Sequence, residues 1–219
     1  GVGCWLLYSD EPFITDSLFI ISLDLSGKAF IFPKETNTAH VILKPETPKP
    51  LGKLTVCLRS YTEITREHCL FSLATNGRDN MFVIFQTAPN ITGICINQEG
   101  RITDSGVIQL WVNGKVYPRK VSNKGFNIPS PASIILGQDR DFYVGGFQAS
   151  QSFVGEISEV YMWDYVLTLE DIKQVQTNDK MGNFLSWTSF SHEIKGDVLV
   201  QPKLQCKCLG YTDSLYYPC

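Results

Sequence analysis

Hydrophobic and polar residues follow one another along this chain with the short period of β-strands. Residues 54–58 alternate with a period of two, which is typical of a half-buried strand. Residues 81–85 are a continuous apolar run that fits a strand covered on both faces, and 132–137 form a short apolar run that ends at a glycine. Glycine and proline recur between such runs, so the pattern predicts a β-sandwich or barrel.

A hairpin is predicted in the middle of the chain. Residues 107–112 favour a strand and lead directly into Asn113-Gly114, two residues that tolerate the positive φ angles of a type I′ turn. The returning strand is expected from Lys115 onward. Residues 155–165, rich in Val, Ile, Tyr and Trp, predict a further strand.

One segment has the pattern of a helix. Thr168 and Asp171 have the spacing of a capping box, in which each side chain bonds the other residue's backbone N–H. Leu169, Ile172 and Val175 then fall on one helical face. The chain is therefore expected to form one all-β domain, a sandwich of two antiparallel sheets with a single short α-helix.

Length and composition agree with a folded domain that has a substantial core. The chain has 219 residues, of which 43% are hydrophobic and 12% aromatic. The net charge of −3 comes from mixed signs without a basic block, so no nucleic-acid partner is predicted. Residues 1–23 contain an apolar stretch that is too short and too charged for a membrane span, and are read as an extension, a leader remnant or a pro-segment.

Cysteine usage and one sequon favour secretion. The chain has seven cysteines, so an oxidising compartment would leave at least one unpaired. Cys206 and Cys208 are spaced too tightly for a usual zinc knuckle. Asn90 begins an Asn-Ile-Thr sequence and is a predicted N-glycosylation site.

The candidate chemistry lies in loops that carry oxygen-bearing side chains. Asp139 and Asp141 follow a predicted buried strand and would repel each other unless water or a cation screened them. Calcium prefers six to eight oxygen ligands, from carboxylates, amides and main-chain carbonyls. Further oxygens are available downstream at Gln148 and Gln151, and before another predicted strand at Asp79 and Asn80. From the residues alone, a solvated acidic loop and a calcium site both fit this pattern.

Several longer stretches resemble the short pentraxin family. They are KAFIFPKE at 28–35, LTVCLRSYTE at 54–63, WVNGK at 111–115, SIILGQ at 133–138 and the segment 145–164. They occur in the family's order, so the resemblance implies a pentraxin domain over 24–203, followed by a cysteine-containing tail at 204–219. It also implies a lectin-like jelly-roll fold, and subunits assembled into a ring, usually of five.

The resemblance further implies a site for two calcium ions per subunit that hold phosphocholine or phosphoethanolamine. The first ion would be held by Asp79, Asn80, Asp139, Asp141 and the carbonyl of Arg140. The second would share Asp139 and Asp141 and add Gln148 and Gln151. Phe85 matches the aromatic residue that borders the choline methyl groups, and Cys57 and Cys95 match the family's intrachain disulfide.

Three departures from the family pattern change these expectations. Gln148 stands where the family usually has Glu, and Asp139 replaces a longer Glu, so we expect the second ion to bind more weakly. The stretch between Phe85 and Ser105 is shortened, which predicts a lost strand or a rebuilt register. Asn113 replaces an Asp linked to complement binding, which puts that partner in doubt.

The function expected from the sequence is therefore a secreted, calcium-dependent pattern-recognition protein of innate immunity, with no enzymatic activity. Glu156 and Glu159 are the only candidates by type for a glycoside-hydrolase pair, and both lie in a predicted strand. His40, His68 and His192 are scattered outside any catalytic motif. The alternatives are a laminin-G-like glycan-binding adhesion module, and a pentraxin that assembles but has lost calcium binding.

Overall fold

The computed structural model describes residues 24–88, 91–95, 106–122, 127–141 and 146–203. The strands are β1 (Lys28–Phe32), β2 (His40–Lys44), β3 (Thr55–Tyr61), β4 (His68–Thr75), β5 (Arg78–Ala88), β6 (Ile91–Cys95), β7 (Gly106–Ile108), β8 (Trp111–Val112), β9 (Lys115–Val116), β10 (Lys120–Ser122), β11 (Ala132–Leu136), β12 (Gly155–Trp163), β13 (Ser191–Lys195) and β14 (Leu199–Pro202). The helices are the 3₁₀ turn η1 (Ala149–Gln151) and the α-helix α1 (Leu169–Gln176).

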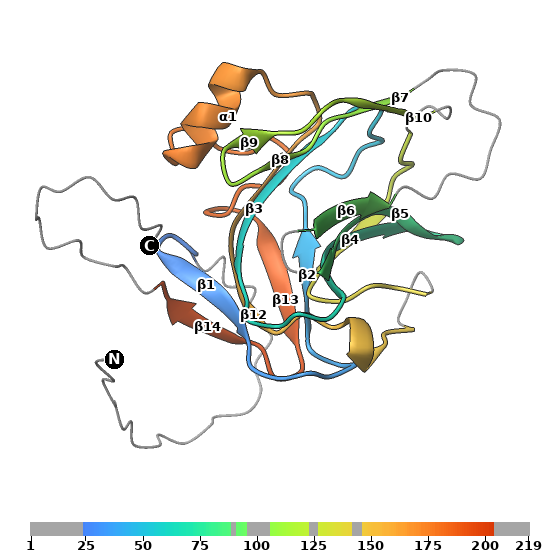
Figure 1. The fold of residues 1–219 in the computed structure, drawn as a ribbon, viewed down its shortest axis with the longest axis vertical. Helices are drawn as coiled ribbons and strands as arrows, with labels where there is room; N and C mark the ends of the chain where they lie inside the picture. The colour runs from blue at the N-terminus through green and yellow to red at the C-terminus, as the bar shows by residue number, and fades with distance from the viewer. Residues whose placement is uncertain (1–23, 89–90, 96–105, 123–126, 142–145, 204–219) are drawn as a thin grey trace, which may run out of the picture.

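Two antiparallel sheets form the body of the molecule (Figure 1). One has four strands in the order β14-β1-β12-β3, and the other has six in the order β13-β2-β11-β4-β5-β6. Neighbouring strands are mostly far apart in sequence, as expected for a jelly roll rather than a meander. The predicted all-β sandwich with one short α-helix is confirmed.

The core lies between the two sheets and is built from both. Phe30 and Phe32 of β1 and Ile157 of β12 are at most 1% exposed, as are Phe71 and Leu73 of β4. All of them belong to one continuous hydrophobic cluster. Because strand side chains alternate between faces, Phe30 and Phe32 lie on one face of β1, and Phe71 and Leu73 on one face of β4.

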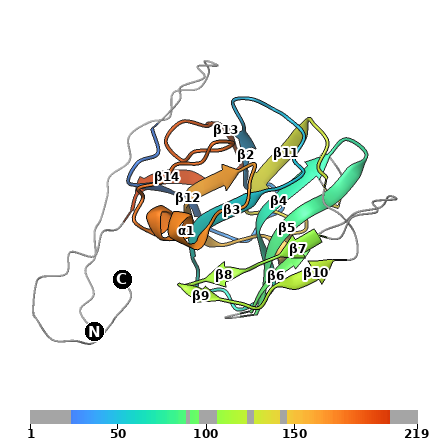
Figure 2. The same cartoon turned by 90° about the horizontal axis from the view of Figure 1, so that it is seen from above.

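The predicted helix and its cap are confirmed. Thr168 accepts a hydrogen bond from the Asp171 backbone N–H, and the Asp171 side chain accepts one from the Thr168 N–H. Val175 is buried and Ile172 packs against the core, but Leu169 is 53% exposed, so the apolar face is shorter than its spacing suggests. Figure 2 shows α1 beside β3 and β12 of the four-stranded sheet.

The region 106–122 differs from the prediction of one strand over residues 107–112. That run divides into β7, which pairs with β10, and β8, which pairs with β9. Asn113 and Gly114 have φ angles of 49° and 76°, so the predicted positive-φ hairpin turn is present. These ribbons join neither large sheet, and within the described residues β3 is hydrogen-bonded only to β12. Among the described residues, β3 is thus an edge strand of its sheet.

Among the residues that the structure describes, no helix is long and apolar enough to cross a membrane.

Candidate functional site

A left-handed glycine turns the chain out of β11 and into the candidate loop. Gly137 has a φ of +85°, and its N–H donates to the Leu70 carbonyl at 3.2 Å, while its own carbonyl accepts from the Phe153 N–H at 2.9 Å. The next residue, Gln138, is buried and donates from Nε2 to the carbonyls of Thr36 and Ala39, at 2.7 and 3.0 Å. These bonds fix the start of the loop that carries Asp139.

Gly137 offers a sharp test of how this loop is positioned. A Cβ added at this position would lie 2.3 Å from Cε1 of the buried Phe32 ring. We expect Gly137→Ala to lower the free energy of unfolding by about 2–4 kcal/mol, from the clash and the positive φ together. The matched control is Gly77→Ala, which has a similar φ of +77° but open space around the Cβ. Urea unfolding of both variants measures the difference, and equal losses would contradict the clash.

Asp139 is the most perturbed carboxyl group of the site. Its side chain is nearly buried, and the residue is 7% exposed. Burial raises the pKa of Asp139 to about 6, against the effect of a hydrogen bond from the Arg140 N–H to Oδ1 at 2.8 Å. The negative charges of Asp141, Asp79 and Glu67 raise that pKa further. Burial and the neighbouring negative charges disfavour the ionised form of Asp139, and a bound cation would stabilise that form.

One amide side chain of the following segment contacts the acidic loop. Gln148 donates from Nε2 to Asp141 Oδ2 at 2.8 Å. Gln151 lies three residues on, in η1, and is partly buried. A glutamine suits this place in the absence of a cation, because it donates to Asp141 where a glutamate would repel it.

Asn80 contributes an oxygen that lacks a protein partner. It has a φ of +47° near the start of β5, and its Oδ1 is buried without a hydrogen bond. Buried polar atoms in native proteins are nearly always paired, so such an atom is a candidate ligand for an ion. Asp79, the preceding residue, is one of the carboxylates that act on Asp139.

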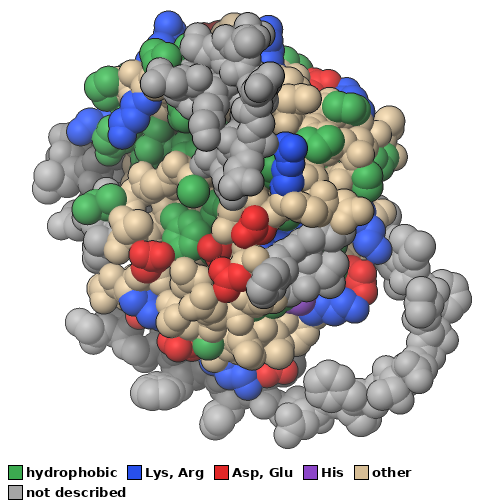
Figure 3. Space-filling view, turned by 90° about the vertical axis from the view of Figure 1, so that its right-hand side faces the viewer, with side chains coloured by type: hydrophobic (Ala, Val, Ile, Leu, Met, Phe, Trp, Pro, Cys, Tyr) green, Lys and Arg blue, Asp and Glu red, His purple; other side chains and the backbone are tan. Residues whose placement is uncertain are grey.

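The predicted ligands lie in three separate segments, 79–80, 139–141 and 148–151. Asp79 and Asp141 act on Asp139, and Gln148 contacts Asp141. Figure 3 shows acidic side chains close together on the side of the molecule that carries β4, β5 and η1. In the described part of the chain, no three His, Cys, Asp or Glu side chains alone form a metal-binding group. A cage here would draw on the amide and main-chain oxygens as well as the carboxylates.

Phe85 lies in β5, the strand that also carries Asp79 and Asn80. It pairs in register with Cys69 of β4 and Gly93 of β6, and it is partly exposed. The predicted glycosylation site Asn90, the extension 1–23 and the tail 204–219 lie outside the described residues.

The expected Cys57–Cys95 disulfide is absent from the structure, which is a correction. Both residues are free thiols, as is the buried Cys69. Cys57 is partly buried in β3 of the four-stranded sheet, whereas Cys95 is exposed at the end of β6 in the six-stranded sheet.

Glu159, one of the two carboxylates considered for an enzyme, has a role within the fold. It has a φ of +52° at a bulge in β12, and its side chain pairs with Arg59 Nε and Lys203 Nζ. Arg59 also donates to the Gln176 carbonyl at 2.7 Å. Glu159 thereby ties β3, the end of α1 and the chain after β14 together.

Glu67 is the site residue that the sequence analysis missed. It directly precedes β4 and carries one of the charges that raise the pKa of Asp139. Glu67 precedes β4, and β4 pairs antiparallel with β11, so the chain that leaves β11 passes beside Glu67. This position is the feature from which Glu67 could have been found.

This chain is similar in sequence to proteins of one family. The sequence profile described as the Pentaxin family matches residues 28–104 and 92–202. C-reactive protein of Xenopus laevis is 47% identical over 90% of this chain and 92% of its own length. Serum amyloid P-component of Mus musculus is 39% identical, over 83% of this chain and 89% of its own length.

A solved structure has the same fold. The heptameric serum-amyloid-P-like pentraxin from Limulus polyphemus superimposes with a TM-score of 0.61 at 24% identity, covering 84% of this chain and 99% of its own.

Proposed function

Because this chain belongs to the pentraxin family, we propose that it is a calcium-dependent recognition protein for ligands that carry phosphocholine or phosphoethanolamine. The protein acts by binding and not by catalysis. It is secreted and takes part in innate pattern recognition.

The observation that carries this proposal is that carboxylates from two separate segments, β5 and the loop after β11, act on one nearly buried carboxyl group. Asp79 lies at the start of β5, and Asp141 lies in the loop after β11. The charges of both raise the pKa of the nearly buried Asp139. Without a cation this arrangement destabilises the folded chain, because like charges are held together in a region of reduced solvation. A divalent cation turns the same repulsion into attraction.

The residues fit two calcium ions of unequal affinity. The first is held by Asp79, Asn80, Asp139, Asp141 and the Arg140 carbonyl. The second shares Asp139 and Asp141 and adds Gln148 and Gln151. A neutral Gln148 contributes less charge than a carboxylate would, so the second ion binds more weakly, and calorimetry showing two equally tight sites would contradict this.

The bound ions would supply positive charge for a phosphate group, and the chain's own residues would shape the rest of the pocket. The partly exposed Phe85 offers an apolar and aromatic surface to the methyl groups of a quaternary ammonium. The chain also assembles into a ring, with five subunits expected. The Limulus relative is heptameric, so the number is open to measurement. Complement binding is not expected, because Asn113, in the turn of the β8–β9 hairpin, stands where the family has an Asp linked to that partner.

Calcium-dependent retention on phosphocholine and phosphoethanolamine resins tests this function. The wild-type chain is expected to bind in millimolar calcium and to elute with a chelator or with free phosphocholine. Asp79→Asn is expected to lose retention by tenfold or more, roughly the effect of removing one carboxylate ligand. The matched control is Asp197→Asn, since Asp197 is exposed and pairs only with Lys34.

Three results would argue against the proposal. Elution by free sugars but not by phosphocholine would favour a glycan-binding adhesion module. Retention that ignores calcium would remove the cation from the mechanism. A chain that forms rings in size-exclusion chromatography with light scattering, yet fails to bind either resin, would be a pentraxin that has lost its calcium site.

A further inference from the structure

Glu67 lies where the chain leaving β11 passes the start of β4. Leu136 pairs with Phe71, and the next step of this antiparallel ladder is the bond from the Gly137 N–H to the Leu70 carbonyl. Continuing outward, the residues after Gly137 run beside those before Leu70. Glu67 is three residues before Leu70 on this side of the ladder.

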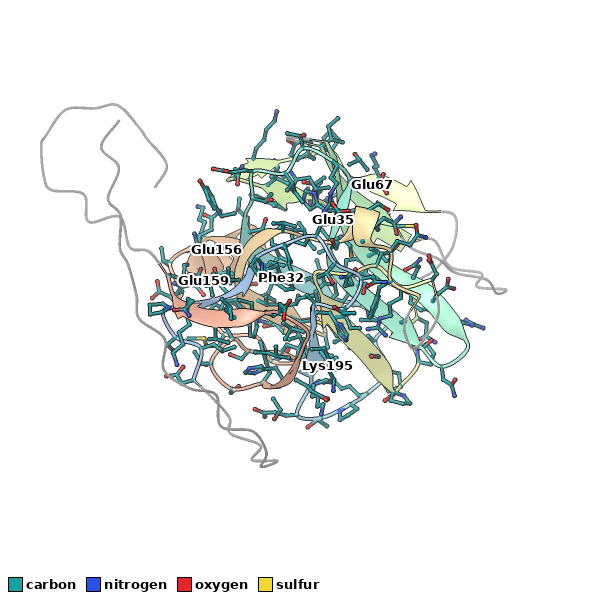
Figure 4. All side chains as sticks on the ribbon, turned by 90° about the horizontal axis from the view of Figure 1, so that it is seen from below. Phe32, Glu35, Glu67, Glu156, Glu159 and Lys195 are labelled. Atoms are coloured by element: carbon teal, nitrogen blue, oxygen red, sulfur yellow. The ribbon has the colours of Figure 1, made fainter. Side chains whose placement is uncertain are left out.

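The segment that carries Glu67 is anchored to η1 by its neighbour. Arg66 Nη1 donates to the carbonyls of Ser150 and Ser152, at 2.9 and 2.7 Å, and to the Glu67 carbonyl at 3.1 Å. Arg66 Nε donates to Glu35 Oε2 at 3.1 Å. Figure 4, in which Glu35 and Glu67 are labelled, shows both beside η1. Glu67 is thereby held next to the segment that contains Gln148 and Gln151.

Arg66 forms its ion pair with Glu35, and among the described residues Glu67 forms none. The side chain of Glu67 is exposed, so it can turn toward a cation at little cost. The unpartnered Oδ1 of Asn80 is an independent sign that this side of the molecule is built to receive a ligand.

The placement of Glu67 affects the number of carboxylates around the ions. Gln148 is neutral where the family usually has Glu, so Asp79, Asp139 and Asp141 are the carboxylates of the proposed ligand set. Glu67 brings that number to four. Affinity of a calcium site follows the number of charged oxygens around it.

We propose that Glu67 is the fourth carboxylate of the cation site and supplies, from the segment before β4, the negative charge that Gln148 lacks. This inference rests on the proposed function and assigns to that site a residue from a different element. It predicts that calcium affinity depends on a segment that the family's ligand set does not include.

Isothermal titration of the full chain with calcium chloride tests the proposal. Glu67→Gln is expected to weaken calcium binding by about three- to tenfold, more at low than at physiological ionic strength. Glu63→Gln is the matched control, because it removes the same charge from an exposed residue of the same β3–β4 connection, and is expected to leave affinity unchanged. Adding Gln148→Glu to the Glu67→Gln variant is expected to restore binding.

Thermal unfolding provides a second readout that does not depend on a binding isotherm. Without calcium, Glu67→Gln is expected to unfold at the same temperature as the wild type or slightly higher, because one repulsive charge is gone. With saturating calcium, its gain in melting temperature is expected to be smaller than that of the wild type. Equal calcium affinities and equal gains in the two proteins would overturn the role of Glu67 alone. A wild-type chain that binds no calcium would overturn the proposed function as well.

Discussion

Replacing Asp139 by Asn is expected to abolish calcium-dependent retention while making the calcium-free protein more stable. Asp139 is 7% exposed, and the pKa of its carboxyl group is raised to about 6 by burial and by its acidic neighbours. In the unfolded chain that pKa returns to about 4, so at pH 7 the folded state holds an ionised carboxylate at a cost. Asn resembles the protonated acid and avoids this cost, and its Oδ1 can still accept from the Arg140 N–H.

The expected gain for the calcium-free protein is roughly 1–3 kcal/mol in the free energy of unfolding at pH 7, from about 1.4 kcal/mol per pH unit between the two pKa values. Urea unfolding with a chelator measures it. The gain is expected to shrink as the pH falls through 6, because the wild-type carboxyl group then takes up a proton in the folded state. With calcium the order reverses, since the wild type gains the binding energy of the ion and the variant does not. A variant that is less stable without calcium, or that keeps calcium-dependent retention, would contradict the account of this site.

Trp187→Ala is expected to cost about 3–5 kcal/mol, the largest loss from a single core substitution proposed for this chain. Trp187 is 2% exposed and packs edge-on against Phe30 and Phe190, with ring centroids 5.3 and 5.8 Å away. Its Nε1 donates to the Leu25 carbonyl at 2.6 Å, so the variant loses a hydrogen bond and opens a cavity at once.

Two further variants separate these contributions. Trp187→Phe keeps an aromatic ring and loses the donor, so a smaller cost of about 1–3 kcal/mol is expected. Tyr61→Ala removes an aromatic side chain that is 67% exposed, and a change within about 0.5 kcal/mol is expected. Denaturant midpoints measured for all three variants separate the cost of the cavity from the cost of the lost hydrogen bond. A Trp187→Ala loss as small as that of Tyr61→Ala would show that this part of the core does not hold the sandwich together.

The candidate site could be predicted only in part. The acidic pair at 139 and 141 and the amides at 148 and 151 are visible as a local run of residue types. That Asp79 acts on Asp139 depends on the pairing of β4 with β5 and β11, which no local pattern encodes. Glu67 was missed for the same reason, because a single glutamate before a strand has no motif. The predicted Cys57–Cys95 bridge is not formed in the structure, where both thiols are free and their strands lie in different sheets.

By itself, the sequence determined the features whose causes lie within a few residues. The capping box of Thr168 and Asp171 is a contact between residues three apart, and the turn at Asn113 and Gly114 follows from the φ angles those residues tolerate. The tertiary structure alone decided which strands became neighbours, and so which charges and thiols came together. The division of 107–112 into two short strands, the unpaired edge of β3 and the position of Glu67 beside Asp139 all depend on contacts between distant segments. Such contacts are set by the packing of the whole sandwich, because strand pairing is selected by the shared core and not by the strand's own residues.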